Sequence, residues 1–326
     1  MRRGTVILSW SLAAAVAIAL VGCGRVADPW SDATGPRVVT SFVPLYCFAK
    51  NVAGPDAQVL CVMGDTGPHH FDPGPHHAVA IRRADVFVIN GLGLDNSIAR
   101  KLIRSSRNRD VKLVEAAANI PTSQLREGGC TCGHEHGDEH AQHDPSHVHY
   151  DPHVWLGIPE AILMVQAIRD ALISVDPEHR SGYESRAAAY VERLQRLADE
   201  GRALLQGKSD RKLLTFHDSL FYFARTFELE VVDSIEATPG QEPDSQKLKE
   251  IIQTSKSKGV RVIAVEPQYS SDTSARVILK ALRNEGIDAE FVVVDTLETA
   301  RPDELNESYY EDRMRQNLQN LAKKLK

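Results

Sequence analysis

The chain has 326 residues, a formal net charge of −6, and contents of 42% hydrophobic and 25% charged residues. Its length exceeds one ordinary domain and favours two compact lobes, while its composition excludes a disordered chain or a multi-span membrane protein. The acidic balance disfavours nucleic acid as a partner.

Residues 1–22 have the features of an export signal. Two arginines precede an apolar stretch, Thr5 to Leu20, that is short for a membrane span. The stretch ends in Leu-Val-Gly-Cys23, which resembles the bacterial lipobox, so we expect cleavage before Cys23 and a lipid on this cysteine. Residues 23–36 are polar and rich in Gly, Pro, Ser and Asp, which predicts a lipidated flexible tether. The alternative is an ordinary secretory signal with an incidental cysteine.

Residues 37–177 alternate short apolar runs with helix-compatible stretches, which predicts an α/β lobe. The predicted strands are 38–42, 57–63, 85–90 and 111–114. A histidine-rich loop over 128–150 interrupts the lobe, and a helix follows from about Pro159 until Asp176-Pro177 ends it.

Residues 178–207 predict one long connecting helix. Seven residues form an apolar or small stripe at alternating spacings of four and three: Tyr183, Ala187, Tyr190, Leu194, Leu197, Gly201 and Leu204. At 1.5 Å per residue such a helix is about 40 Å long, enough to join two lobes.

Residues 208–326 repeat the α/β pattern and predict a second lobe. The predicted strands are 212–216, 229–233, 260–265 and 289–294, with helices at about 272–284 and from Glu307 onwards. The expected fold is therefore α/β with two lobes, each a mainly parallel sheet flanked by helices, joined by one long helix.

Three candidate metal ligands follow predicted strands, where open α/β sheets bind their ligands. His217 and Asp295 come directly after a strand, and His69 comes a few residues after another. His153 lies in Asp151-Pro152-His153-Val154-Trp155, where the proline and the tryptophan can fix a loop. Three imidazoles and one carboxylate suit Zn²⁺, because they complete a tetrahedral shell that holds the metal without an activated water.

The contexts of these residues resemble the zinc and manganese solute-binding proteins of ABC importers. The resemblance is carried by Pro68-His69-His70-Phe71-Asp72-Pro73, by the His153 segment and by Thr215-Phe216-His217-Asp218-Ser219, and it extends over nearly the whole mature chain. It implies a metal site between two lobes joined by a rigid helix, limited lobe closure, and the ligands His69, His153, His217 and Asp295. His70 could exchange with His69.

The resemblance also bears on the metal and on its surroundings. Relatives that handle manganese often carry glutamate at the position of His217, so zinc is favoured over manganese. Gly67, Gly74 and Gly157 replace residues that are polar in relatives, which puts the hydrogen bonding around the ligands in question.

The segment before His153 carries further histidines that could bind metal: His134, His136, His140, His143, His147 and His149. We expect accessory zinc sites that are weaker than the main site, because a loop loses entropy on coordination. The alternative is a solvated linker whose histidines have no specific role.

Four cysteines remain after Cys23. A bridge between Cys47 and Cys61 is the preferred pairing, with two free buried thiols as the alternative, and Cys130 and Cys132 could be soft metal ligands.

The favoured function is capture of Zn²⁺ outside a bacterial membrane, by a lipid-anchored monomer that is not an enzyme, for an ABC permease and its ATPase. A manganese-binding, adhesin or metal-sensing lipoprotein of the same fold is the first alternative. The second is a zinc hydrolase with Asp218, Glu266 or Asp295 as its base, although neither a His-Glu-x-x-His helix nor a Gly-x-Ser-x-Gly motif is present.

Overall fold

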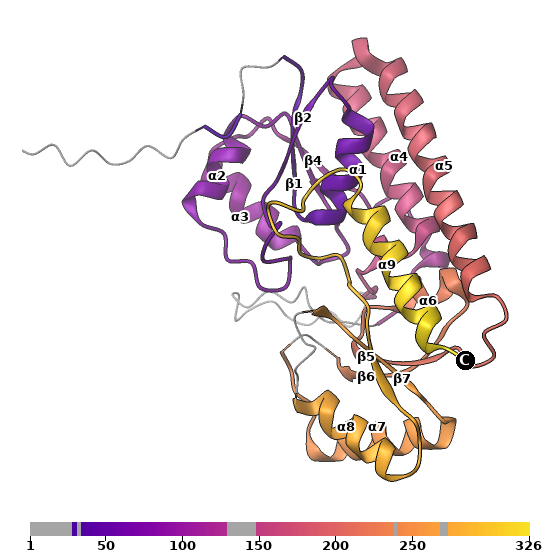
Figure 1. Cartoon of the computed structure of the whole chain (residues 1–326). Coiled ribbons are helices and arrows are strands. Elements are labelled where there is room, and N and C mark those ends of the chain that lie inside the picture. Colours follow the sequence, from indigo (N-terminus) through magenta and orange to yellow (C-terminus); the bar gives the residue numbers. More distant parts are fainter. Residues whose placement is uncertain (1–27, 31–33, 129–147, 238–239, 268–272) are drawn as a thin grey trace, which may run out of the picture.

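Two α/β lobes lie one above the other in the computed structural model of the chain (Figure 1). The structure describes residues 28–30, 34–128, 148–237, 240–267 and 273–326. Each lobe contains a four-stranded sheet in which all strands are parallel, so the predicted fold class is confirmed.

The N-terminal sheet has the strand order β2-β1-β3-β4. Its strands are β1 (Arg37–Thr40), β2 (Gln58–Cys61), β3 (Val86–Ile89) and β4 (Lys112–Glu115). All four residues of β3 are buried, as expected for a central parallel strand with an uninterrupted Val-Phe-Val-Ile sequence. The elements that connect and follow these strands are α1 (Val43–Ala53), α2 (Pro75–Arg82), α3 (Asn96–Ser106), and the 3-10 turns η1 (Thr122–Gln124) and η2 (Val154–Leu156).

Two long helices join the lobes. α4 (Ile158–Val175) has proline in its first turn and ends before Asp176, and the short turn η3 (Pro177–His179) leads into α5 (Arg180–Leu205). The predicted connecting helix is thus present, with 26 residues. Its predicted stripe is buried from Tyr183 to Gly201, whereas Leu204 is exposed.

The C-terminal sheet repeats the topology of the first, with the order β6-β5-β7-β8. Its strands are β5 (Lys212–His217), β6 (Glu230–Glu236), β7 (Val262–Val265) and β8 (Glu290–Val293). Its helices are α6 (Phe221–Phe227), α7 (Ser245–Lys258), α8 (Thr273–Asn284) and α9 (Tyr309–Lys324). The carboxyl ends of both sheets point toward the space between the lobes (Figure 1).

The two faces of the C-terminal sheet belong to different hydrophobic cores. Leu213 and Val262 join a core that continues through α5 into the N-terminal lobe. Their neighbours Leu214 and Ile263 point the other way, into a smaller core under α7 and α8. This alternation follows the two-residue period of a strand. The larger core is therefore shared by both lobes.

The last helix also ties the lobes together. α9 packs against α5 and α1 rather than against its own lobe alone (Figure 1). The Tyr310 hydroxyl donates to the Trp155 carbonyl at 2.7 Å, and its ring meets Phe48 of α1 edge-on. At the packing of α5 on α6 and α9, an added Cβ at Gly201 would lie 2.4 Å from Phe227 and 2.8 Å from Leu318.

A short part of the predicted tether is docked on the N-terminal lobe. Trp30 is 6% exposed, belongs to the shared core, and donates its indole N–H to the Ala80 carbonyl at the end of α2. Asp28 accepts from the Trp30 backbone N–H and pairs with Arg83. The prediction that the folded body starts at Arg37 therefore needs correction at this point, because a buried tryptophan lies within the polar segment.

The bridge predicted between Cys47 and Cys61 is not formed. Both cysteines are free thiols, as in the alternative. The Cys47 thiol donates to the Asn306 carbonyl, whereas the Cys61 thiol points to the Ser41 carbonyl. Burial raises the pKa of Cys61 to about 12, so this thiol stays protonated. Cys130 and Cys132 lie outside the described residues.

Within the described ranges, no helix combines the length and apolar character that crossing a membrane requires. The signal segment at 1–22 and Cys23 lie outside these ranges.

Candidate metal centre

The loop that carries His69 is pressed against the opposite lobe. It runs from β2 to α2, and the Ala300 N–H donates to the Gly64 carbonyl at 2.7 Å. Gly67 has φ +67°, and an added Cβ would lie 3.3 Å from Cβ of Glu298. A glycine therefore allows both the backbone conformation and the close approach that place His69 beside Glu298.

His153 is held by the aspartate two residues before it. Asp151 accepts from the His153 backbone N–H at 3.0 Å and contacts Nδ1 of the ring at 2.8 Å. The Asn90 side chain donates to the carbonyl of Pro152, and the Trp155 indole donates to the Thr296 carbonyl across the lobes. These contacts set the orientation of the His153 ring, which could not be predicted from the sequence.

His217 is the last residue of β5 and is held in the same way. Its Nδ1 hydrogen bonds to the carboxylate of Glu266, which directly follows β7. The Thr296 hydroxyl donates to the other carboxylate oxygen of Glu266 at 3.2 Å. Because β5 and β7 are neighbours in the sheet, their carboxyl ends place the imidazole and its partner side by side.

The carboxylate between the histidines belongs to Glu298, in the loop after β8. Its oxygens lie 3.4 Å from Nε2 of His69 and 3.9 Å from Nε2 of His153. The preceding residue, Leu297, is fully buried and has φ +61°, a conformation that side chains rarely adopt. This turn of the backbone directs Glu298 between the lobes.

The four side chains converge from both lobes. One donor atom from each of His69, His153, His217 and Glu298 lies within 4.8 Å of all the others, and no other such group of three or more His, Cys, Asp or Glu was found among the described residues. The side chains are 0–7% exposed. His70, in contrast, is exposed and lies outside the group.

The nitrogen atoms of this group are poorly satisfied by the protein alone. A carboxylate accepts from Nδ1 of both His153 and His217, so in the neutral rings each Nε2 carries a lone pair. These two Nε2 atoms face each other at 3.2 Å. Both ring nitrogens of His69 and one oxygen of Glu298 are buried and find no hydrogen-bond partner among the described residues. Such an arrangement needs a cation or a proton at its centre.

The charges around the site shift two pKa values. Burial alone would lower the pKa of His217, but Glu266, Glu298 and Asp151 outweigh it and raise the pKa to about 9. Burial opposes ionisation of Glu298, but the surrounding imidazoles lower its pKa. The site thus favours positive charge on nitrogen and negative charge on oxygen.

Asp295, the predicted fourth member, is not part of the group. Its carboxylate accepts from the Leu297 N–H at 2.8 Å and lies 4.0 Å from the Arg313 guanidinium. Its backbone exchanges two hydrogen bonds with the side chain of Asn317 on α9. Asp295 therefore shapes the turn, and Glu298 three residues later reaches the histidines. The only sequence signal for Glu298 was a second carboxylate shortly after the strand.

Despite the three glycines that replace polar residues of relatives, two of the three histidines have a hydrogen-bond partner at Nδ1. Gly157 packs against Tyr222, and Gly74 precedes α2. His153 and His217 each have a carboxylate partner at Nδ1, whereas Nδ1 of His69 has no hydrogen-bond partner within the described ranges. Among the three histidines, His69 is thus the one whose Nδ1 the described residues leave without a partner.

The stem of the histidine-rich loop connects to the same network. Arg126 donates to both oxygens of Asp218 at 2.7 and 2.9 Å and lies 3.5 Å from Asp151. The Gly128 N–H donates to the carbonyl of His149, the one accessory histidine within the described residues. The others lie outside them: His134, His136, His140, His143 and His147.

Comparison with known proteins decides the family. Residues 38–324 match the model of the family described as zinc-uptake complex component A, periplasmic. The chain belongs to this family. It is 31% identical over 268 residues to the zinc-binding lipoprotein AdcA of Streptococcus pneumoniae. The matched region covers 81% of this chain but only 51% of AdcA. The chain thus spans about half the length of AdcA.

Solved structures agree with this assignment. A crystal structure of ZnuA is 28% identical, with a TM-score of 0.71 over 90% of this chain and 100% of that chain. The laminin-binding protein Lmb of Streptococcus agalactiae, described as a bifunctional protein with adhesin and metal-transporting activity, is 26% identical, with a TM-score of 0.70 over 90% of this chain and 100% of that chain.

Proposed function

We propose that this protein binds one Zn²⁺ ion through His69, His153, His217 and Glu298 and delivers it to an ABC importer. The observation that carries the proposal is the pair of Nε2 atoms that face each other at 3.2 Å while carboxylates hold both Nδ1 atoms. Two lone pairs at this distance repel each other unless a cation or a proton lies between them.

The donor set favours zinc over manganese. Three imidazoles and one carboxylate form a tetrahedral set typical of Zn²⁺, whereas manganese prefers sites richer in oxygen. The same set argues against a hydrolase, because a catalytic zinc keeps one position open for water. In this proposal Glu298 takes that position, and the family is one of uptake components.

The cellular setting follows from the family and from the sequence of the amino terminus. An ABC permease with its ATPase is the partner, and the protein acts outside the bacterial membrane. We infer that Cys23 carries the lipid anchor, which agrees with the lipoprotein AdcA. We also infer that the protein acts as a monomer, because all four ligands come from one chain.

The histidine-rich loop is proposed to collect zinc for the buried site. Its stem lies beside Asp151, the partner of His153. Deleting residues 130–149 should slow zinc capture at low concentration without removing the tight site.

The deciding experiment is a competition titration of the metal-free protein with Zn²⁺ and Mn²⁺. We expect tight binding of one Zn²⁺ by the wild type and by the 130–149 deletion, and loss of the tight site in His153→Ala. His179→Ala is the matched control, because this exposed histidine pairs with Asp176 away from the group. Loss of tight binding in the loop deletion, with His153→Ala unaffected, would sink the assignment.

Adhesion remains a second candidate because Lmb is described as having both activities. Binding of the purified protein to immobilised laminin tests it. Delivery to an importer is tested by growth under zinc starvation, and unimpaired growth of a deletion strain would contradict it.

A further inference from the structure

One face of the N-terminal lobe is basic although the chain as a whole is acidic. Between Arg82 and Lys112 the sequence holds eight Lys and Arg residues and three Asp residues. Its exposed cations lie at the end of α2, along α3 and just after α3: Arg82, Arg83, Arg100, Lys101, Arg104, Arg107 and Arg109. We call these seven residues the basic face.

Most of this positive charge is not neutralised by the protein. In the described part of the chain, five members of the basic face form no ion pair: Arg82, Lys101, Arg104, Arg107 and Arg109. Arginines elsewhere usually do, for example Arg126 with Asp218 and Arg186 with Asp56. Of the three aspartates in the segment, Asp95 is buried and accepts from Ser41. The basic face therefore presents a net positive surface to solvent.

A shallow groove lies within this face. It has a volume of about 380 Å³ and is lined on the α2 side by Arg82 and Pro75 and on the α3 side by Lys101, Leu102 and Ser105. Two cations and a hydroxyl above apolar side chains suit a phosphate attached to an apolar body.

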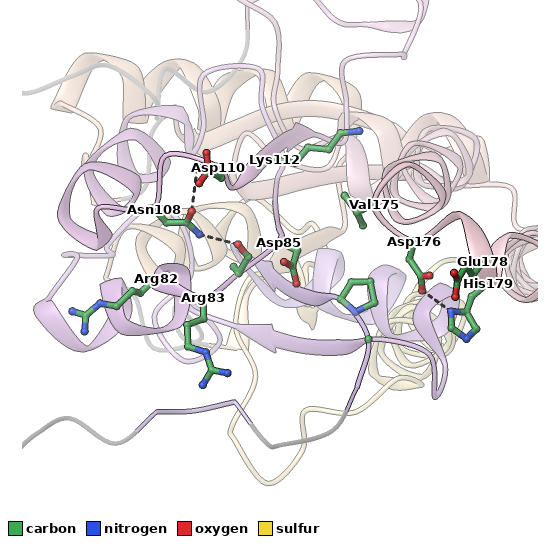
Figure 2. A pocket seen from close by; sticks show the side chains of 13 residues that line it. Arg82, Arg83, Asp85, Asn108, Asp110, Lys112, Val175, Asp176, Glu178 and His179 are labelled. Carbon is green, nitrogen blue, oxygen red and sulfur yellow. Dashed lines mark hydrogen bonds and ion pairs between the residues drawn. The ribbon is translucent and has the colours of Figure 1, made fainter.

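A larger neighbouring pocket does not have this character. It has a volume of about 840 Å³ and lies where Gly35 and Pro36 lead into β1. Four acidic residues line it beside its cations: Asp85, Asp110, Asp176 and Glu178. Figure 2 shows Arg82 and Arg83 extending away from the part of this pocket that holds His179. Of the five unpaired cations, Arg82 lines this pocket, whereas Lys101, Arg104, Arg107 and Arg109 do not. Most of the uncompensated charge thus lies outside the pocket, on the basic face.

The docked tether brings the amino terminus to the same place. Trp30 is fixed to the end of α2, and Asp28 pairs with Arg83 of the basic face. Asp28 lies five positions after Cys23, so a chain attached at Cys23 reaches at most ~18 Å before it meets this face. A tether free up to Arg37 would reach ~50 Å. The structure thus keeps the basic face near any membrane that holds the amino terminus.

From these two observations we propose that the basic face docks on an anionic membrane surface, with its arginines and lysines on lipid phosphates. Nucleic acid would be attracted by the same charges, but it is not found at an anchored amino terminus. An acidic protein is the other possible occupant. The membrane is favoured because the chain itself approaches it at this face, and because the charge is spread over the end of α2, the part of α3 from Arg100 onward and the residues after α3 instead of being confined to one pocket.

Vesicle sedimentation tests the proposal without the lipid. The chain would begin at Gly24, which keeps every residue that the structure describes, so failure here is distinct from failure of lipid anchoring. We expect binding to vesicles with about one third phosphatidylglycerol at near-physiological salt, little binding to pure phosphatidylcholine, and release in high salt.

Two triple variants distinguish an effect of the basic face from an effect of the total net charge. Arg100→Gln, Lys101→Gln and Arg104→Gln together should weaken binding about 100-fold, since each cation near an anionic surface strengthens binding about five-fold. The control combines Lys249→Gln, Lys280→Gln and Lys323→Gln, three exposed lysines that form no ion pair with any described residue, and should bind as before. Unchanged zinc affinity verifies the fold of both.

Equal binding by the two triple variants would overturn the proposal. A lack of binding to the anionic vesicles would also overturn it. If the first triple variant then still impaired zinc uptake in cells, the partner of the basic face would be an acidic protein instead.

Discussion

The imidazoles of His153 and His217 are oriented by hydrogen bonds within the protein. Each ring is fixed by a carboxylate at Nδ1, Asp151 or Glu266, which leaves Nε2 directed at the other ring. Such partners fix the tautomer and raise the basicity of the ligand. The site is therefore organised for a cation by residues that do not touch it.

Replacing each of the two neighbouring carboxylates by its amide, in separate variants, distinguishes the roles of Glu298 and Asp295. Glu298→Gln removes the charge between the histidines, so zinc affinity should fall by more than the roughly 100-fold that loss of an outer partner causes. Asp295→Asn keeps an acceptor for the Leu297 N–H and should leave affinity nearly unchanged. A chelator competition assay measures both. The opposite ranking would restore Asp295 as the ligand.

Zinc binding should weaken in acid. The raised pKa of His217, about 9, means that below this pH the metal-free ring holds an extra proton that Zn²⁺ must displace. Apparent affinity should fall about ten-fold per pH unit below about 9 for this one proton. Titrations at several pH values check this, and calorimetry in buffers of different ionisation heat should find about one proton released near neutral pH.

The same pKa has the opposite effect on the stability of the metal-free protein. Because the folded pKa lies above the ordinary value of 6.5, the proton stabilises the fold fully below about pH 6.5, and this contribution is lost as the pH rises through about 9. Urea unfolding of metal-free protein across this range measures it. In Glu266→Gln, which lacks the main charge that raises the pKa, the dependence should flatten.

Among the residues of the site, the three histidines could be predicted from the sequence, whereas the carboxylate of Glu298 could not. His69, His153 and His217 lie in recognisable segments after strands or beside proline and tryptophan. The position of Glu298 depends on the positive φ of Leu297 and on contacts between Asp295 and Asn317, which is 22 residues away. Such contacts have no local pattern.

At the scale of structural elements, the stem of the histidine-rich loop is linked to the metal centre through an ion-pair network. Arg126 joins Asp218, which follows His217, to Asp151, which holds His153. Arg126→Gln should weaken zinc binding about ten-fold, within the range seen when outer partners are lost. Arg225→Gln is the control, because Arg225 pairs with Glu160 and forms no ion pair with Asp151 or Asp218 in the part of the chain that the structure describes. Equal affinities of the two variants would show that the stem does not tune the site.

The contact of α5 with α6 and α9 tolerates no side chain at Gly201. In Gly201→Val the new atoms would overlap Phe227 and Leu318, so the free energy of unfolding should fall by at least the roughly 1–3 kcal/mol typical of overpacking. Gly207→Ala is not an equivalent control because of its positive φ, so Ala203→Val, at an exposed position on the same helix, is used. Thermal unfolding measures both, and similar melting temperatures would contradict this account of the packing.

Most elements were predictable because their signals are local. Apolar runs of four to seven residues predicted the eight strands that the described residues contain, and the stripe on α5 predicted the connecting helix. The docking of Trp30 was not predictable, because a single tryptophan in a polar segment does not indicate which surface it meets. The free thiols of Cys47 and Cys61 likewise depend on side-chain directions that spacing does not reveal.

For the whole molecule, zinc should stabilise both lobes together. Ligands come from both lobes, and the larger hydrophobic core is continuous between them. Zinc at about 1,000 times its dissociation constant should add about 4 kcal/mol to the free energy of unfolding. We expect one calorimetric transition that moves upward with zinc, but not in Glu298→Gln. Two transitions, of which only one moves, would show that the lobes unfold independently.

The shared core also has a consequence for the time that an ion remains bound. Lobes that keep one core cannot swing far apart without exposing it to water, so an ion enclosed here leaves only when the loops around Gly67 and Leu297 separate locally. The residence time of zinc is then set by the opening of two loops, and a receptor that pulls on them would shorten it without weakening the affinity of the free protein.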